Sequence, residues 1–73
     1  MKMIQIVELV HVILELKKDK INYDFIDSKL NCFNDVKKKY PCVDWSFLEN
    51  VREKTKEEIN NWIDFCTKTV HVL

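Results

Sequence analysis

Ten of the fourteen residues in the segment MIQIVELVHVILEL, residues 3–16, are apolar, and a folded chain has to remove them from water. A membrane-spanning helix needs about 20 apolar residues, so this segment is too short to cross a bilayer. It also contains Glu8, His11 and Glu15, and no small-residue cleavage site of the secretory type follows it. We therefore expect a folded element here and no association with a membrane.

The spacing of the polar residues in this segment predicts a helix. Its many valines and isoleucines favour a strand, but a half-buried strand would alternate polar and apolar residues. Glu8, His11 and Glu15 instead recur at gaps of three and four, which places them on one narrow stripe of a helix. We expect a helix over residues 3–18 that is apolar around well over half of its circumference.

A second, amphipathic helix is expected over residues 23–39. Asn22 stands where its side chain can cap the N-terminus of this helix. The apolar positions fall on one side of the helix: Phe25, Ile26, Leu30, Phe33, Val36 and Tyr40. Three lysines at positions 37–39 suit the negative end of the helix dipole. Pro41 then ends the helix, because the residue before a proline avoids helical geometry.

The longest expected helix runs over residues 45–71. It begins at Asp44 or Ser46, and Ser46 with Glu49 has the spacing of a capping box. Apolar or small residues then recur every three or four positions: Leu48, Val51, Thr55, Ile59, Trp62, Cys66, Thr69 or Val70, and Leu73. Short connections between these helices predict a single all-α domain over residues 1–73, a small three-helix bundle with a long C-terminal helix.

These three helices carry more apolar surface than they can cover for one another. The apolar part of the first helix's circumference is wider than two neighbouring helices can cover. The third helix is longer than the other two, so its end extends beyond them. A chain of 73 residues is also near the lower limit for a stable single core, so we expect a two-fold homodimer. The expected self-association residues are Val7, Val10, Ile13, Leu14, Phe65, Val70 and Leu73. In the alternative, the third helix kinks near Asn60-Asn61 and folds back over the first within a monomer.

The sequence lacks the glycine-dependent motifs of common catalytic and nucleotide-binding sites. It contains no glycine, which excludes the usual P-loop, dinucleotide fingerprint and nucleophile elbow. Cys32, Cys42 and Cys66 with His71 would supply four zinc ligands, but they lack the close pairing of structural zinc sites. An odd number of cysteines without short spacing favours free thiols and a cytoplasmic location. We expect no metal, no cofactor and no enzymatic activity.

An acidic row on the outer face of the third helix is the strongest candidate for a partner-binding surface. It consists of Glu49, Glu53, Glu57 and Asp64, and like charges four residues apart repel by about 0.2–0.5 kcal/mol. A local repulsion without evident structural gain points to function, such as docking on a basic surface that normally holds nucleic-acid phosphate. The alternative is an ordinary solvated face, because lysines and Arg52 flank the row.

The charge balance argues against nucleic acid as a partner. Twelve basic and twelve acidic residues cancel, whereas a nucleic-acid binder usually carries a basic excess. We expect a small protein-binding regulator or inhibitor that acts on an unknown protein target by steric block or acidic mimicry. A small DNA-binding transcriptional regulator is the alternative, with the second and third helices as a helix-turn-helix. The abundance of Lys, Asn and Ile indicates an AT-rich genome, such as that of a phage or another mobile element.

Overall fold

Helices account for most of the chain in the computed structural model, which describes the backbone of residues 3–71 and the side chains of residues 6–71. The elements in chain order are α1 (Met3–Leu16), α2 (Tyr23–Lys29), η1 (Leu30–Phe33), α3 (Asn34–Lys39), α4 (Ser46–Glu49), η2 (Val51–Glu53) and α5 (Lys56–Val70). The two η elements are short 3₁₀-helices. Residues 3–71 contain no strand, and the predicted all-α class is confirmed.

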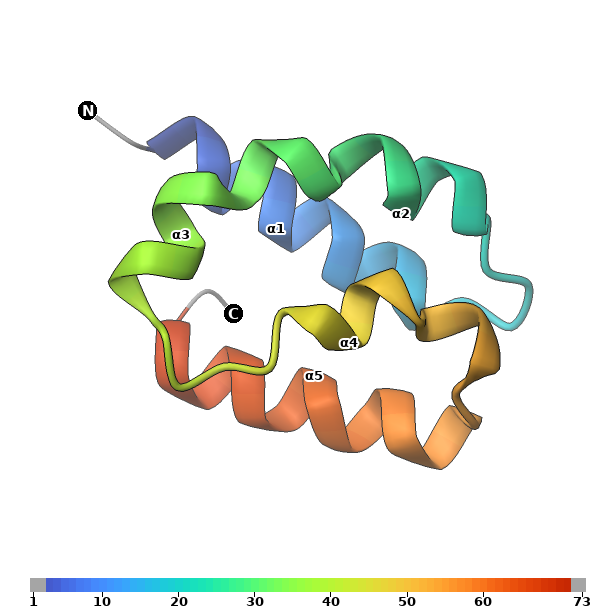
Figure 1. Ribbon diagram of the computed structural model, residues 1–73. Coiled ribbons are helices and arrows are strands. Elements are labelled where there is room, and N and C mark those ends of the chain that lie inside the picture. Colours follow the sequence, from blue (N-terminus) through green and yellow to red (C-terminus); the bar gives the residue numbers. More distant parts are fainter. Residues whose placement is uncertain (1–2, 72–73) are drawn as a thin grey trace.

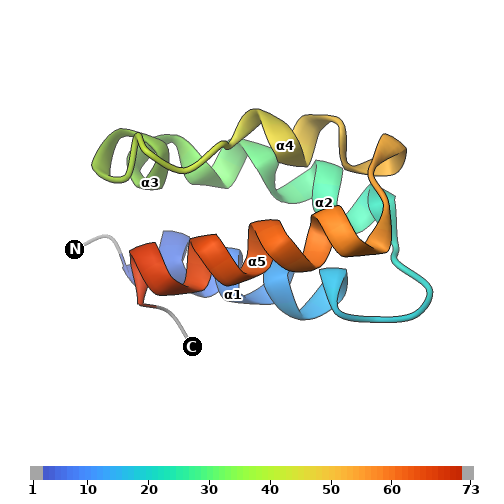
Figure 2. The ribbon, with the colours of Figure 1, turned by 90° about the horizontal axis from the view of Figure 1, so that it is seen from below.

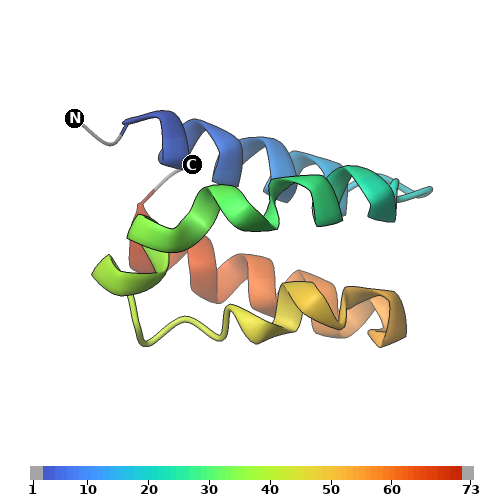
Figure 3. The ribbon, with the colours of Figure 1, turned by 45° about the horizontal axis from the view of Figure 1, so that its top comes forward.

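The helical segments run alternately in opposite directions and form the four sides of a small bundle (Figure 1). Figure 2 shows α1 and α5 in one layer, with the run α2–η1–α3 and the run α4–η2 in the other. In Figure 3 the α2–η1–α3 run lies along α1, and α4 lies along α5 on the opposite side of the bundle. Direct packing of α1 on α2, η1 and α3 ties the two layers together, and α2 packs on α4 within the second layer.

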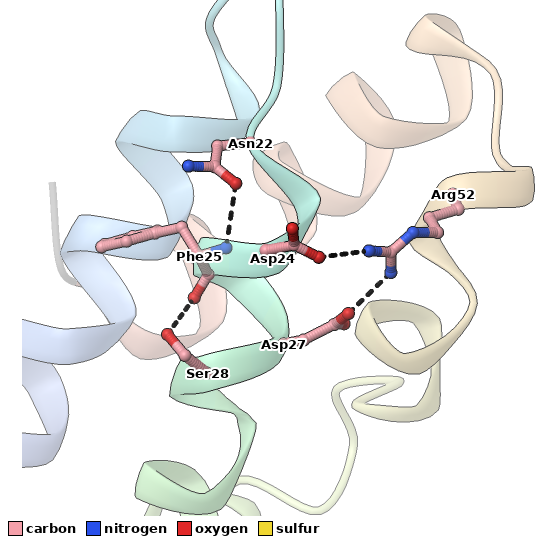
Figure 4. Close-up of polar contacts among 6 residues, drawn as sticks. All are labelled: Asn22, Asp24, Phe25, Asp27, Ser28 and Arg52. Carbon is pink, nitrogen blue, oxygen red and sulfur yellow. Dashed lines mark hydrogen bonds and ion pairs between the residues drawn. The ribbon is translucent and has the colours of Figure 1, made fainter.

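The start of α2 matches its prediction because Asn22 caps it. The Asn22 Oδ1 accepts a hydrogen bond from the Phe25 backbone N–H at 3.2 Å (Figure 4). The Asn22 backbone N–H in turn donates to Glu15 Oε2 at 2.9 Å, so the end of α1 is tied to the start of α2. The single helix predicted over residues 23–39 is interrupted by the 3₁₀ segment η1, and the helical run ends at Lys39, before Pro41, as predicted.

The single helix predicted over residues 45–71 is wrong, because the chain turns back after η2. Lys54 and Thr55 have extended backbones, with ψ of 146° and 164°, and α5 returns antiparallel to α4 (Figure 1). A capping box holds this new start. The Thr55 hydroxyl accepts from the Glu58 N–H at 3.1 Å, and Glu58 Oε1 accepts from the Thr55 N–H at 2.9 Å. The chain therefore starts a new helix, α5, instead of continuing the preceding one.

The capping box predicted at the start of this region does not form. Ser46 donates its hydroxyl proton to Asp44 Oδ1 at 2.6 Å, and no side chain caps α4. The chain does fold back as in the monomeric alternative, but at Lys54 and Thr55. Asn60-Asn61, where a kink was expected, lies inside α5.

A lysine at the start of α5 joins the returning helix to the end of α1. The Lys56 ammonium donates to the carbonyl oxygens of Leu16 at 3.1 Å and Lys18 at 2.6 Å. These carbonyls belong to the last turn of α1 and the loop that follows, where backbone acceptors lack helical partners. The contact supplies positive charge at the negative end of the α1 dipole and fixes the position of α5 beside it.

One hydrophobic core fills the space between the two layers. Its buried members are Leu9, Val12, Ile13, Leu16, Ile26, Phe33, Val36, Val43, Trp45, Phe47, Leu48, Val51, Ile59, Trp62, Ile63, Cys66 and Val70. Trp62 stacks on Phe47 with ring centres 5.5 Å apart, and its indole N–H donates to the Asp44 carbonyl at 2.8 Å. The Trp45 indole N–H donates to the Tyr40 carbonyl at 3.0 Å. Both indoles are thus buried with their polar edge satisfied, as large aromatic core residues require.

Candidate protein-binding surface

The outer face of α1 presents two large apolar side chains to solvent. Val7 is 48% exposed and Leu14 is 50% exposed, whereas Ile13 between them in the sequence is fully buried. Leu14 follows Val7 by seven positions, so the two lie two turns apart on one face of the helix, with the exposed His11 between them. The partly buried Val10 borders the same face. We call the set Val7, Val10, His11 and Leu14 the α1 stripe.

Two residues predicted for the self-association surface lie in the core of the chain itself. Ile13 has no exposed surface and Val70 is 6% exposed. The reason is the fold-back, since it returns α5 alongside α1 (Figure 2), and Ile13 and Val70 then both face the common core. Leu73, the last predicted member, lies outside the described residues.

Phe65 is exposed on a different side of the molecule from the α1 stripe. Its side chain is 49% exposed. Nine residues separate it from Lys56, and at about 100° per residue this places the two half a turn apart around α5. Lys56 reaches the end of α1, so Phe65 projects away from α1. The predicted apolar surface is therefore divided into the α1 stripe and an isolated Phe65.

The predicted acidic row is divided as well. Glu49 lies in α4, Glu53 in η2, and Glu57 and Asp64 lie in α5, which runs in the opposite direction. All four side chains are exposed, and Asp64 forms an ion pair with Lys68 at 3.0 Å. Glu53 and Glu57 are not helical neighbours, because the extended Lys54 and Thr55 separate them. The helical spacing of four residues on which the predicted repulsion rested therefore does not apply to Glu53 and Glu57.

Glu8 joins three polar side chains between α1 and the α2–η1 run. Its Oε2 accepts a hydrogen bond from Lys29 Nζ at 2.7 Å and one from Cys32 Sγ at 3.7 Å, and its Oε1 lies 3.4 Å from His11 Nδ1. The Lys29 hydrogen bond is the main reason that the pKa of Glu8 lies below its ordinary value. The spacing in the sequence places Glu8 on a polar stripe of α1 but does not indicate this cluster, because Lys29 and Cys32 lie more than 20 residues away.

Glu15 is a second α1 carboxylate that turns inward, and only 8% of the residue is exposed. It accepts the Asn22 backbone N–H at 2.9 Å and forms an ion pair with Lys18 at 3.0 Å. The Asn22 hydrogen bond is the largest cause of a lowered Glu15 pKa, followed by the Lys18 contact. With both carboxylates turned toward the α2 side, the apolar part of the outer face is left to the α1 stripe.

Arg52 connects η2 to α2 at the far side of the bundle. Its two terminal nitrogens reach Asp27 Oδ2 at 2.6 Å and Asp24 Oδ1 at 2.9 Å (Figure 4). Its guanidinium carbon also lies 5.5 Å from the centre of the Tyr23 ring. The hydrogen bond to Asp27 is the first cause of a raised Arg52 pKa. In the sequence Arg52 is only a flank of the predicted acidic row, and no local spacing indicates this pairing across 25 residues or more.

The three thiols are free and differ in environment. Cys42 is exposed, Cys32 is partly buried, and Cys66 is buried. Burial raises the pKa of Cys66 to about 11, because an apolar surrounding disfavours the thiolate. Within residues 3–71 no group of three or more His, Cys, Asp or Glu side chains is placed to hold a metal ion. That same stretch contains no helix of the length and apolarity needed to span a membrane.

Comparison of the chain with protein-family models, curated protein sequences and solved structures gives no match. The candidate binding surface is therefore chosen from the structure of this chain alone. The Glu8 and Arg52 clusters hold neighbouring helices together, and their charged groups are already paired. The α1 stripe differs from them, because its exposed apolar side chains add nothing to the core of the chain. It is the candidate binding surface.

Proposed function

We propose that the protein binds another protein through the α1 stripe, as a small regulator or inhibitor without catalytic activity of its own. The observation that supports this is the half-exposed pair Val7 and Leu14, on a helix whose other described apolar residues are buried or partly buried. Large apolar side chains exposed together on one helix face are a feature of helices that dock in an apolar groove of a partner. Covering these side chains would contribute about 25 cal/mol for each Å² removed from water.

The charges beside the α1 stripe indicate the chemistry of the partner. Lys17, Lys18 and Lys20 follow the end of α1, all three are exposed, and Asp19 is the one acidic residue among them. A partner surface with an apolar centre and carboxylates at one edge would complement this arrangement. The division of the acidic row favours steric block through α1 over mimicry of a phosphate-bearing ligand.

The alternative function, a DNA-binding regulator, gains no comparable support. In a helix-turn-helix, the second helix lies in the major groove and reads several bases. The element at that position in this chain, α4, spans four residues, Ser46–Glu49, and its Phe47 and Leu48 face the core.

Charge substitution on the two apolar surfaces tests the proposal. Val7→Lys and Leu14→Lys should each weaken binding to the partner isolated from the source organism by about tenfold or more, because a lysine in an apolar contact loses hydration. Phe65→Lys is the matched control, being equally exposed but on another side of the molecule, and should leave the dissociation constant unchanged. Calorimetry on the purified pair measures the affinity, and circular dichroism verifies folding. The proposal would be overturned if all three variants bound the partner with the affinity of the unmodified protein, or if no partner bound saturably.

A further inference from the structure

The segment from α4 to α5 carries the sequence pattern of one continuous helix, although the chain turns back within it. Its apolar or small positions recur at gaps of three and four without interruption: Leu48, Val51, Thr55, Ile59, Trp62, Cys66 and Val70. All except Thr55 are buried in the closed fold. The same side chains would lie on one face of a straight helix over residues 46–70.

The turn that interrupts this pattern is short and contains no residue that forbids a helix. Only Lys54 and Thr55 lie between the last residue of η2 and the first of α5. Arg52, Glu53 and Lys54 are good or fair helix formers, and neither glycine nor proline occurs in the turn. The contacts that hold it include the capping box of Thr55 with Glu58, the two hydrogen bonds of Lys56 to the end of α1, and the Lys54 ammonium over the Phe47 ring.

We propose that two copies of the chain exchange α5, and that α4, η2 and α5 then straighten into one helix. In the exchanged dimer, α5 of each copy packs on the core of the other copy. Apart from the Thr55–Glu58 capping box, the contacts that α5 makes with the rest of the closed chain are available there, because the partner is identical. Trp62 would stack on the Phe47 of the other copy, and its indole N–H would donate to that copy's Asp44 carbonyl, as each does within one chain. Exchange of an identical element is a low-cost route to a dimer, because it requires no new interface chemistry.

The balance between the closed chain and the dimer is then set by the turn. The closed form has the Thr55 cap at the N-terminus of α5. The open form replaces that cap with backbone hydrogen bonds, since the first N–H groups of α5 find acceptors one turn earlier in the same helix. This inference is independent of the proposed function, because the exchanged surface is the core around α5 and leaves the α1 stripe exposed.

A proline at Lys56 separates the two forms. Thr55 is already extended and position 56 is the first residue of α5, so Lys56→Pro fits the closed chain. In a continuous helix the same proline removes a hydrogen bond and clashes with the preceding turn. Lys56→Ala is the matched control, because it loses the same ammonium contacts without restricting the backbone. Thr55→Ala removes the cap and favours the helix, and should tighten dimerisation by about tenfold or more because each dimer relieves two turns.

The measurement is light scattering after equilibration at high protein concentration. The dimer fraction should increase from Lys56→Pro, where it is negligible, to Lys56→Ala and then Thr55→Ala. Dimers refolded from equal amounts of isotope-labelled and unlabelled chains should show Phe47–Trp62 nuclear Overhauser contacts between chains. As much dimer for Lys56→Pro as for Lys56→Ala would overturn the proposal. So would Phe47–Trp62 contacts found only within one chain, or a Thr55→Ala protein that stays monomeric. Thr55→Ala keeps the test decisive if the proline variant fails to fold.

Discussion

Two carboxylates on α1 attach the neighbouring helix α2 through their hydrogen bonds. Glu8 and Glu15 lie two helical turns apart, and each accepts hydrogen bonds from the segment that follows α1. Glu8 receives Lys29 from the end of α2, and Glu15 receives the backbone of Asn22 at its start. Together they hold both ends of α2 against α1. Their positions on a polar stripe were evident from the sequence, but their partners were not.

Acid should destabilise the fold through these carboxylates. Both pKa values lie below the ordinary value of 4.5. Their contribution is therefore complete above about pH 4.5 and is lost as the pH falls through the lower pKa values of the folded state. Glu8→Gln and Glu15→Gln should each lower the melting temperature at neutral pH and make its decrease shallower between about pH 5 and about pH 3.

Thermal unfolding followed by circular dichroism across this pH range measures the effect. Glu57→Gln, at an exposed carboxylate of α5, is the control for the loss of one negative charge. The lowered pKa of Glu58 contributes to acid sensitivity in every one of these proteins, so some slope remains in each variant. Slopes identical to that of the unmodified protein in Glu8→Gln and Glu15→Gln would contradict the assignment.

At the level of elements, local signals predicted helix boundaries well when only one signal was present. The spacing of polar residues gave α1, Asn22 gave the start of α2, and Pro41 gave the end of α3. The prediction failed where two signals competed. The apolar repeat favoured one helix over residues 45–71, but Thr55 with Glu58 has the spacing of a capping box and starts a new helix. That second signal is present in the sequence as Thr55 followed three residues later by Glu58.

Adjacent residues of α1 should differ sharply in their effect on stability. Ile13 is fully buried and Leu14 is half exposed, on the same helix and with similar side-chain volume. Ile13→Ala should cost about 2–5 kcal/mol of unfolding free energy through lost burial and a residual cavity. Leu14→Ala should cost about 0.5 kcal/mol or less, as at other surface positions. Urea denaturation measures both, and a comparable loss for the two variants would show that the α1 stripe is covered by the chain itself.

At the scale of the whole molecule, composition and periodicity predicted the all-α class but not the arrangement. The contacts that set the arrangement join residues distant in the chain, such as Lys56 with Leu16 and Trp62 with Asp44. No periodicity encodes such pairs. The Cα radius of gyration is 11.3 Å, close to the value of about 11 Å expected for one compact domain of this length. The fold-back therefore supplies much of the cover for which the sequence suggested a second copy, and homodimerisation stays a prediction.

The indole pair in the core has a spectroscopic consequence. Trp45 and Trp62 have ring centres 6.1 Å apart at an interplanar angle of 76°, and the sequence contains no other tryptophan. Two indoles this close and this far from coplanar couple their electronic transitions and produce a paired positive and negative band in circular dichroism. Because one ring precedes α4 and the other lies in α5, the band reports whether these two parts are together. Stopped-flow circular dichroism at this band would measure how fast α5 packs against the segment before α4 during folding, without any added label.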